Sequence, residues 1–219
     1  MNWILEVYPF FTLMGSLIIL LGSWITAIAY RGKNGERYSI TRYFVSELGE
    51  VGVSRLSWLF NGSLIIGSAF FLIMMPGVGI RLGNLWGYLG MVAGMVASAA
   101  CLLVGVFPMN RIKLHTNAAM TYFRFGMATV LLFSLAILAQ PAHQRVIPLK
   151  VMAVGGMAFA AYAAFLIHTG RMEKKHAANL LDTADVHERP RFWWTPFLEW
   201  LVVILTILWF LALSTGQVG

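Results

Sequence analysis

The chain has 219 residues, of which 59% are hydrophobic and only 11% are charged, and its mean hydropathy is +0.74. This composition excludes an ordinary soluble domain and predicts an integral membrane protein. The formal net charge is +7, but the basic residues are scattered through short connections between apolar segments, which favours membrane lipids and not nucleic acid as partners.

The first predicted membrane helix covers residues 8–30. Glu6 precedes it, no Lys or Arg does, and its apolar run of about 20 residues is too long for the core of a signal peptide, so we expect a membrane span. The connection over residues 31–56 is basic and contains several glycines. It either lies partly on the membrane surface or forms a solvated loop.

Five further apolar segments follow, at residues 57–75, 84–107, 116–139, 149–168 and 196–214. We expect Pro76 and Gly77 to end the second segment. Small residues recur at four-residue spacing along the third segment, which favours close packing between helices. The sequence therefore predicts an all-α bundle of six membrane helices that forms a single domain over residues 1–219.

The distribution of basic residues predicts the orientation of this bundle. The first, third and fifth connections hold 12 of the 16 Lys and Arg residues, whereas the second and fourth hold only three. Basic connections stay in the cytoplasm, so we expect both termini on the non-cytoplasmic side. We expect the protein in the cytoplasmic membrane of a prokaryote.

The fourth segment contains an arginine inside its apolar run. Asn117, Thr121 and Arg124 lie at i, i+4 and i+7, so they share one helical face. A buried guanidinium needs a partner, and Glu199 is the natural one, with Glu47 as the competitor. Arg124 either staples two helices together or holds a phosphate or carboxylate headgroup in a polar pocket near the cytoplasmic leaflet.

The polar residues of the cytoplasmic half define this candidate ligand pocket. They are Glu47, Asn61, His115, Asn117, Arg124, His168 and Glu199.

Two further kinds of chemistry are weaker alternatives. A haem between His115 and His168, or a zinc site that adds Glu47 or Glu199, is conceivable. Neither histidine belongs to a spaced ligand motif, so we predict no metal and no cofactor. Ser46, beside Glu47 and across the pocket from His115, is the only conceivable nucleophile. We name no catalytic residues and expect a protein that is not an enzyme.

Three short motifs occur in a fixed order along the chain. They are Val45-Ser46-Glu47-Leu48-Gly49, Leu59-Phe60-Asn61-Gly62, and Val104-Gly105-Val106-Phe107-Pro108 followed by His115. On these motifs the chain resembles, over residues 10–164, the family of six-span membrane proteins catalogued as domain of unknown function 998.

The resemblance implies the fold and the topology but assigns no chemistry. It also implies a distant relation to the frag1-like and autophagy-modulator six-span proteins, a group linked to lipid or glycolipid handling. It draws attention to Glu47, Asn61 and His115, which fall within or directly after its motifs.

Three functions remain open from the sequence. The first is the binding of a lipid-like or other amphiphilic ligand in the cytoplasmic-side pocket. The second is an accessory or assembly subunit that packs against a larger membrane complex. The third is an intramembrane hydrolase that uses a histidine and a carboxylate.

Overall fold

The computed structural model describes residues 2–175 and 189–215. Within these ranges the chain forms six long α-helices and no β-strand, and each helix contains a stretch long and apolar enough to cross a membrane. This confirms the predicted all-helical architecture with six candidate spans. The helices are α1 (Asn2–Ala29), α2 (Ser57–Leu82), α3 (Leu85–Val106), α4 (Ile112–Leu138), α5 (Met152–Lys175) and α6 (Trp194–Thr215).

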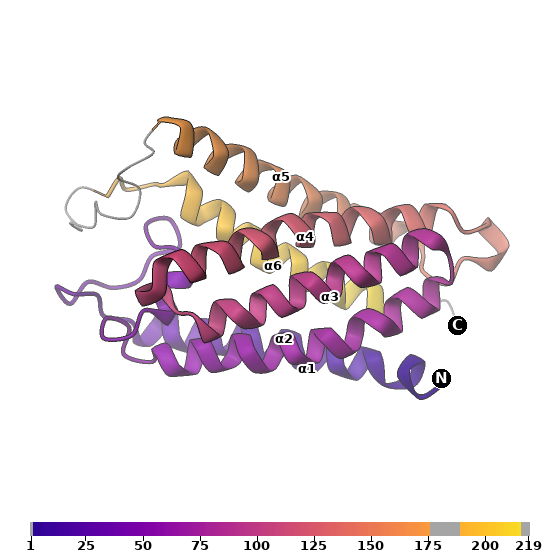
Figure 1. Cartoon of the computed structure of the whole chain (residues 1–219), viewed down its shortest axis with the longest axis horizontal. Helices are drawn as coiled ribbons and strands as arrows, with labels where there is room; N and C mark the ends of the chain where they lie inside the picture. Colours follow the sequence, from indigo (N-terminus) through magenta and orange to yellow (C-terminus); the bar gives the residue numbers. More distant parts are fainter. Residues whose placement is uncertain (1, 176–188, 216–219) are drawn as a thin grey trace.

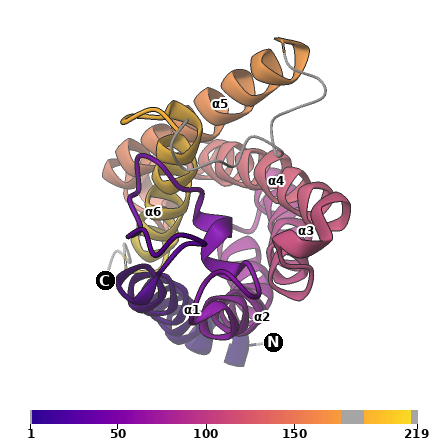
Figure 2. The same cartoon turned by 90° about the vertical axis from the view of Figure 1, so that its left-hand side faces the viewer.

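The helices form a closed ring, because each packs against the next along the chain and α6 packs against α1. Viewed end-on, the ring surrounds the short 3-10 helix η1 (Val45–Gly49), which lies near its centre (Figure 2). The ends of α1, α3 and α5 and the starts of α2, α4 and α6 lie at this end of the bundle, the η1 end (Figure 1). The start of α1 and the end of α6 lie at the opposite end, as expected for an even number of spans.

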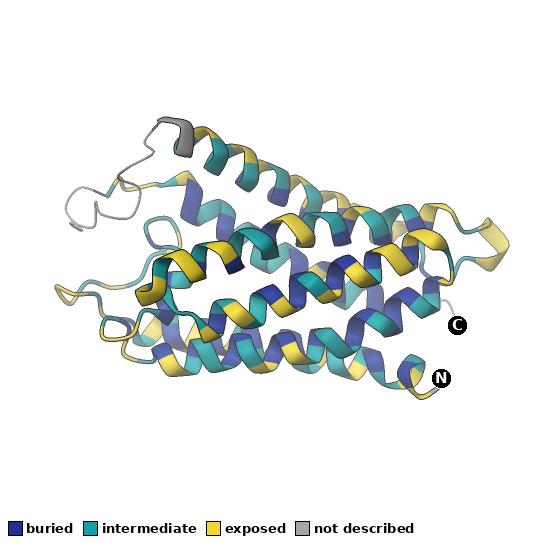
Figure 3. Ribbon diagram, viewed as in Figure 1, coloured by how far each residue is buried: buried dark blue, intermediate teal, exposed yellow. Residues whose placement is uncertain are grey.

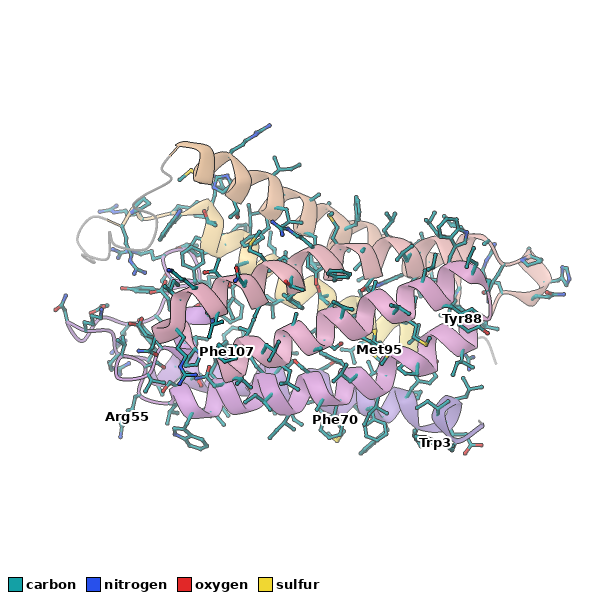
Figure 4. The ribbon with its side chains drawn as sticks, in the orientation of Figure 1. Trp3, Arg55, Phe70, Tyr88, Met95 and Phe107 are labelled. Atoms are coloured by element: carbon teal, nitrogen blue, oxygen red, sulfur yellow. The ribbon has the colours of Figure 1, made fainter. Side chains whose placement is uncertain are left out.

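Exposed residues occur along all six helices (Figure 3), and many of them are large and apolar. Ile28, Trp58 and Leu85 expose 74%, 70% and 67% of their surfaces. Trp3 and Tyr88, labelled in Figure 4 toward the end opposite η1, are exposed aromatic residues of the kind that lies at membrane interfaces. The outer surface of the ring is therefore suited to contact with lipid.

Glycines allow neighbouring helices to approach closely. A methyl group at Gly15 of α1 would lie 2.9 Å from the carbonyl oxygen of Gly67 in α2. A methyl group at Gly90 of α3 would lie 2.5 Å from the ring of Phe133 in α4. Larger residues at these positions would force the helices apart.

The second helix does not end at Pro76 as predicted. It continues through Pro76 to Leu82 and ends at Gly83, which adopts a left-handed conformation with φ of 62° and donates its N–H to the Gly79 carbonyl at 3.2 Å. Membrane helices tolerate an internal proline because surrounding helices limit the cost of the lost hydrogen bond. Gly77 follows the proline and makes room for the Tyr8 ring of α1.

Three other helices extend beyond the predicted spans. α1 begins at Asn2, α4 begins at Ile112, and α5 continues to Lys175. The apolar runs used for the prediction correspond to the hydrocarbon core, whereas a helix can continue into the interface.

Candidate functional site

Residues 45–49, which form η1, close the ring at the η1 end, and we call them the plug. Val45, Glu47, Leu48 and Gly49 are buried. A buried helical turn leaves backbone N–H and C=O groups that need partners within the protein. Side chains from other parts of the chain supply these partners at both ends of the plug.

Glu199 of α6 binds the start of the plug. Its Oε2 atom accepts the N–H of Val45 at 2.7 Å. The Glu199 side chain is buried. This short hydrogen bond is buried, so Glu199 fixes the plug to α6.

Glu47, inside the plug, forms a buried ion pair with Arg189. The Nη1 atom of Arg189 donates to Oε1 and Oε2 of Glu47 at 3.0 and 2.9 Å, and to the carbonyl of Arg42 at 3.2 Å. The Arg189 and Glu47 side chains are only 12% and 6% exposed. The guanidinium group also lies 4.7 Å from the centre of the Tyr43 ring, within the range of a cation–π contact.

The ionisation of Glu47 reflects two opposing influences. Burial raises the pKa of its carboxyl group above the ordinary value of 4.5, and the neighbouring Arg189 opposes that rise. The N–H of Phe44, which donates to Oε1 at 2.8 Å, also favours the charged form. Arg189 therefore offsets part of the cost of burying the carboxylate.

The other end of the plug is held by two asparagines. Asn61 of α2 donates its Nδ2 atom to the carbonyl of Gly49 at 3.0 Å. A methyl group at Gly49 would collide with the Asn61 side chain, so glycine is needed for this approach. Asn110 forms a paired contact with Val51, accepting its N–H at 2.9 Å and donating to its carbonyl at 3.0 Å.

The three sequence motifs meet at the plug. A methyl group at Gly105 would lie 2.7 Å from the Asn61 carbonyl oxygen, which shows how closely the third motif approaches the second. The Nδ1 atom of His115 lies 2.8 Å from the carbonyl oxygen of Phe107, which is labelled in Figure 4 toward the η1 end. Together with the bond from Asn61 to Gly49, these contacts join all three motifs at one place.

A cavity of about 80 Å³ lies inside the ring beside the plug, and we call it the inner cavity. All six helices contribute to its lining, which is mainly apolar. Ser23 of α1 lines it with a buried Oγ atom that has no hydrogen-bond partner among the described residues. A buried hydroxyl group without a partner is unfavourable, so this position suits a group that enters the cavity.

A second cavity, of about 160 Å³, lies at the η1 end between α4, α5 and α6, and we call it the side cavity. The η1 end of α5 leans away from α4 (Figures 1 and 2). Thr169 of α5 lines the side cavity, and its buried Oγ1 atom also has no partner within the described part of the chain. The two cavities adjoin, because both are lined by Ser46, His115, Ala119, Phe123 and Glu199.

His115 has a defined orientation between these cavities. It is 5% exposed, and its Nδ1 atom faces the Phe107 carbonyl. Because a carbonyl oxygen accepts hydrogen bonds, Nδ1 carries the hydrogen and Nε2 is the acceptor in the neutral ring. Nε2 is therefore the nitrogen of His115 with a lone pair to offer.

A chain of hydroxyl groups forms part of the wall of the inner cavity. Thr206 of α6 donates to the Tyr162 hydroxyl of α5 at 2.9 Å, and Tyr162 donates to the Tyr122 hydroxyl of α4 at 3.3 Å. All three residues line the inner cavity. These three residues could not be predicted from the sequence, because single hydroxyl groups on three different helices form no motif.

Four of the predicted site residues lie at the plug. His115 and Glu199 line both cavities, which is the position expected for residues of a ligand pocket at this end of the bundle. Glu47 and Asn61 instead hold the plug in place. The partner of Glu47 is Arg189, which precedes α6 and has no distinguishing sequence pattern around it.

The structure does not pair Arg124 with Glu199, which corrects that expectation. Arg124 and Asn117 are exposed on the outer face of α4, and Arg124 makes no hydrogen bond or ion pair with another described residue. The inner face of this helix carries His115, so the opposite side points away from the cavities. His168 is half-buried on α5 and lies outside both linings.

The metal alternatives gain no geometric support. In residues 2–175 and 189–215, no group of three or more His, Cys, Asp or Glu side chains is placed to hold a metal ion. His115 and His168 also do not line a common cavity.

Comparison with known proteins gives one family match. Residues 13–216 match the family described as "Protein of unknown function (DUF998)". No curated protein and no solved structure matches the chain. The relation to frag1-like and autophagy-modulator proteins therefore stays a prediction.

Proposed function

Because the chain belongs to the DUF998 family, whose description assigns no activity, we propose from the geometry that it binds a lipid-like amphiphile in the inner and side cavities. One observation carries this proposal. Two mainly apolar cavities adjoin at Ser46, His115 and Glu199, which are polar side chains. Binding sites for small apolar ligands combine such a lining with a few polar groups that fix orientation.

The cavity volumes suit a ligand with a single chain. One water-sized group needs roughly 10–15 Å³ of such space. By this measure the inner cavity of about 80 Å³ and the side cavity of about 160 Å³ hold one extended chain and a small polar group. A lipid with two full acyl chains would have to leave much of its volume in the bilayer.

The position of the side cavity supports entry from the membrane. It lies between α4, α5 and α6 where α5 leans away from α4 (Figure 1). The unpartnered hydroxyl groups of Ser23 and Thr169 offer one polar contact in each cavity. An amphiphile can thus pass from the lipid phase into the side cavity and extend into the inner cavity.

We place the η1 end of the bundle at the cytoplasmic side. The connections at this end are the first, third and fifth, which hold 12 of the 16 Lys and Arg residues. This orientation puts both termini outside and the side cavity in the cytoplasmic half of the membrane. It agrees with the expected location in the cytoplasmic membrane of a prokaryote.

The hydrolase alternative has less support. Glu199 accepts a backbone N–H group of the plug, and His115 directs Nδ1 to Phe107, so the two side chains do not form a carboxylate–histidine relay. The Oγ atom of Ser46 donates to the sulfur of Met109 at 3.5 Å. For the subunit alternative, the apolar outer surface suits lipid as well as a protein partner.

Native mass spectrometry of protein extracted in mild detergent tests the proposal. We expect a single-chain amphiphile to stay bound at a ratio close to one to one and to be identified by its mass after release. Protein that is empty after every mild extraction would contradict the proposal. A stable complex with a larger membrane protein and no bound lipid would favour the subunit alternative.

A further inference from the structure

We propose that the ligand carries a hydrogen-bond donor at the plug and a hydrogen-bond acceptor about two helical turns deeper, and that its head is not anionic. This inference rests on the proposed function, because it concerns the ligand of the same cavities. The lining of the inner cavity has polar side chains at two levels. Those at the first level accept hydrogen bonds, and those at the second level donate them.

The two levels follow from matching spacings on two helices. His115 and Tyr122 lie seven residues apart on α4, and Glu199 and Thr206 lie seven residues apart on α6. Seven residues are close to two turns, or about 10 Å along the helix, so the members of each pair share one face. All four residues line the inner cavity, and both helices run away from the η1 end.

The level beside the plug accepts hydrogen bonds. His115 offers Nε2, because Nδ1 faces the Phe107 carbonyl. Glu199 offers its carboxyl oxygens, which have room for more bonds than the one from Val45. A hydroxyl group of the ligand can donate to one of these acceptors, and an amine group can donate to both.

The deeper level donates a hydrogen bond. In the chain from Thr206 through Tyr162 to Tyr122, three hydroxyl groups carry three hydrogens and use two of them. The direction of the two bonds leaves the spare hydrogen on Tyr122. A carbonyl or ether oxygen in the ligand would accept it.

On α4 and α6, the region between the levels is apolar. Ala119 of α4 and Val203 of α6 line the inner cavity at intermediate positions along their helices. This stretch suits methylene groups, and Ser23 of α1 adds one hydroxyl group elsewhere in the lining. The ligand is therefore polar at two points and apolar between them.

The charges of the lining disfavour an anionic head. Among the described residues, no Lys or Arg lines either cavity, and Arg124 lies on the outer face of α4. A phosphate or carboxylate group in these cavities would be a buried anion with no cation to pair with, which is costly in a medium of low dielectric constant. A head without negative charge therefore replaces the phosphate or carboxylate headgroup that Arg124 suggested.

Four probes of equal chain length test the inference on the intact protein. The first is an ω-hydroxy fatty acid methyl ester whose hydroxyl and ester carbonyl are about 10 Å apart when extended. The second lacks the hydroxyl, the third keeps the hydroxyl but lacks the ester, and the fourth carries a phosphate in place of the hydroxyl. Dissociation constants are measured by native mass spectrometry for the wild type, Tyr122→Phe and the control Tyr88→Phe, whose ring is exposed on α3.

We expect the hydroxy ester to bind the wild type about fivefold more tightly than either probe that lacks one group, and the phosphate to bind most weakly. Tyr122→Phe should weaken the hydroxy ester about fivefold and leave the probe without an ester unchanged. Tyr88→Phe should change nothing.

The outcomes separate this inference from the proposed function. If no probe binds and no lipid is retained, the proposed function itself fails. If probes bind but the phosphate binds most tightly, or if removal of either group has no effect, only the inference is overturned. The comparison of probes on the wild type decides this even if Tyr122→Phe does not fold.

Discussion

Arg189 and Glu47 are 142 residues apart in the sequence, yet their side chains form a buried ion pair with an Nη1–Oε2 distance of 2.9 Å. This pair joins the segment before α6 to the plug. Glu199 and Asn61 join α6 and α2 to the same plug. Several polar residues that the sequence suggests as ligand contacts are therefore engaged in holding a buried turn beside the inner cavity.

Loss of the arginine should destabilise the protein in a way that depends on pH. Arg189→Met is expected to lower the free energy of unfolding by about 3 kcal/mol, because it leaves the Glu47 carboxylate buried without a cation. Burial already raises the pKa of Glu47 and Arg189 opposes the rise, so the variant raises that pKa further. The measurement is the apparent Tm of detergent-solubilised protein across the pH range.

The direction of the pH dependence follows from that raised pKa. The carboxyl group has a higher pKa in the folded state than in the unfolded state, where the pKa is 4.5. Below pH 4.5 the group is protonated and does not destabilise the fold. As the pH rises through the folded-state pKa, the group loses its proton and destabilises the fold. The deficit of Arg189→Met should thus be smaller at about pH 5 than at about pH 8. In the control Glu47→Gln/Arg189→Met, the dependence of the stability deficit on pH should disappear. If Arg189→Met were as stable as the wild type at about pH 8, the role of the ion pair would be refuted.

A double-mutant cycle tests the contact between the first two motifs. Asn61→Ala removes the hydrogen bond to the Gly49 carbonyl and should lower the free energy of unfolding by about 1 kcal/mol. Gly49→Ala should cost more, because the new methyl group would collide with Asn61 and lie 3.0 Å from Phe60. The double variant should lose at least about 1 kcal/mol less free energy of unfolding than the two single losses added together, because shortening Asn61 relieves the collision. Additive losses would show that the two positions are not in contact.

The helical architecture could be predicted because it depends on local composition. Runs of apolar residues long enough to cross the bilayer appear in the sequence and correspond to α1 through α6. The end of α2 could not be placed correctly, because the cost of Pro76 depends on the helices packed around it, whereas the left-handed turn at Gly83 ends the helix.

The site could be predicted only in part. The periodicity of α4 groups Arg124 with Asn117, but it does not say whether their shared face points inward or outward. His115 and Glu199 were found because histidines and carboxylates in apolar segments are unusual. Arg189 was missed because its pairing with Glu47 depends on the folding back of a polar connection, for which the sequence holds no periodic signal.

Replacement of the intramembrane arginine tests its assignment to the outer face. Arg124→Leu should change the free energy of unfolding by no more than about 0.5 kcal/mol, because the side chain is exposed and forms no bond with described residues. The amount of retained amphiphile should also stay the same. A loss of stability as large as that of Arg189→Met would instead support a structural staple, and a loss of ligand alone would support a headgroup contact.

Cysteine labelling tests the orientation. In a Cys101→Ala background, single cysteines replace Asn34, in the connection after α1, or His143, in the connection after α4, and both sites are exposed. A membrane-impermeant maleimide should label the His143→Cys variant on intact cells and the Asn34→Cys variant only after permeabilisation. The reverse pattern would invert the orientation and leave the cavities unaffected.

The central claim, that the adjoining cavities hold an amphiphile, is tested most directly by blocking their junction. Ala119 lines both cavities, so Ala119→Phe fills the space where they meet, whereas the control Ala164→Phe adds the same ring at an exposed position of α5. Native mass spectrometry should show about tenfold less retained amphiphile for Ala119→Phe and wild-type retention for Ala164→Phe, with both proteins folded. Equal retention by the two variants would contradict binding in these cavities.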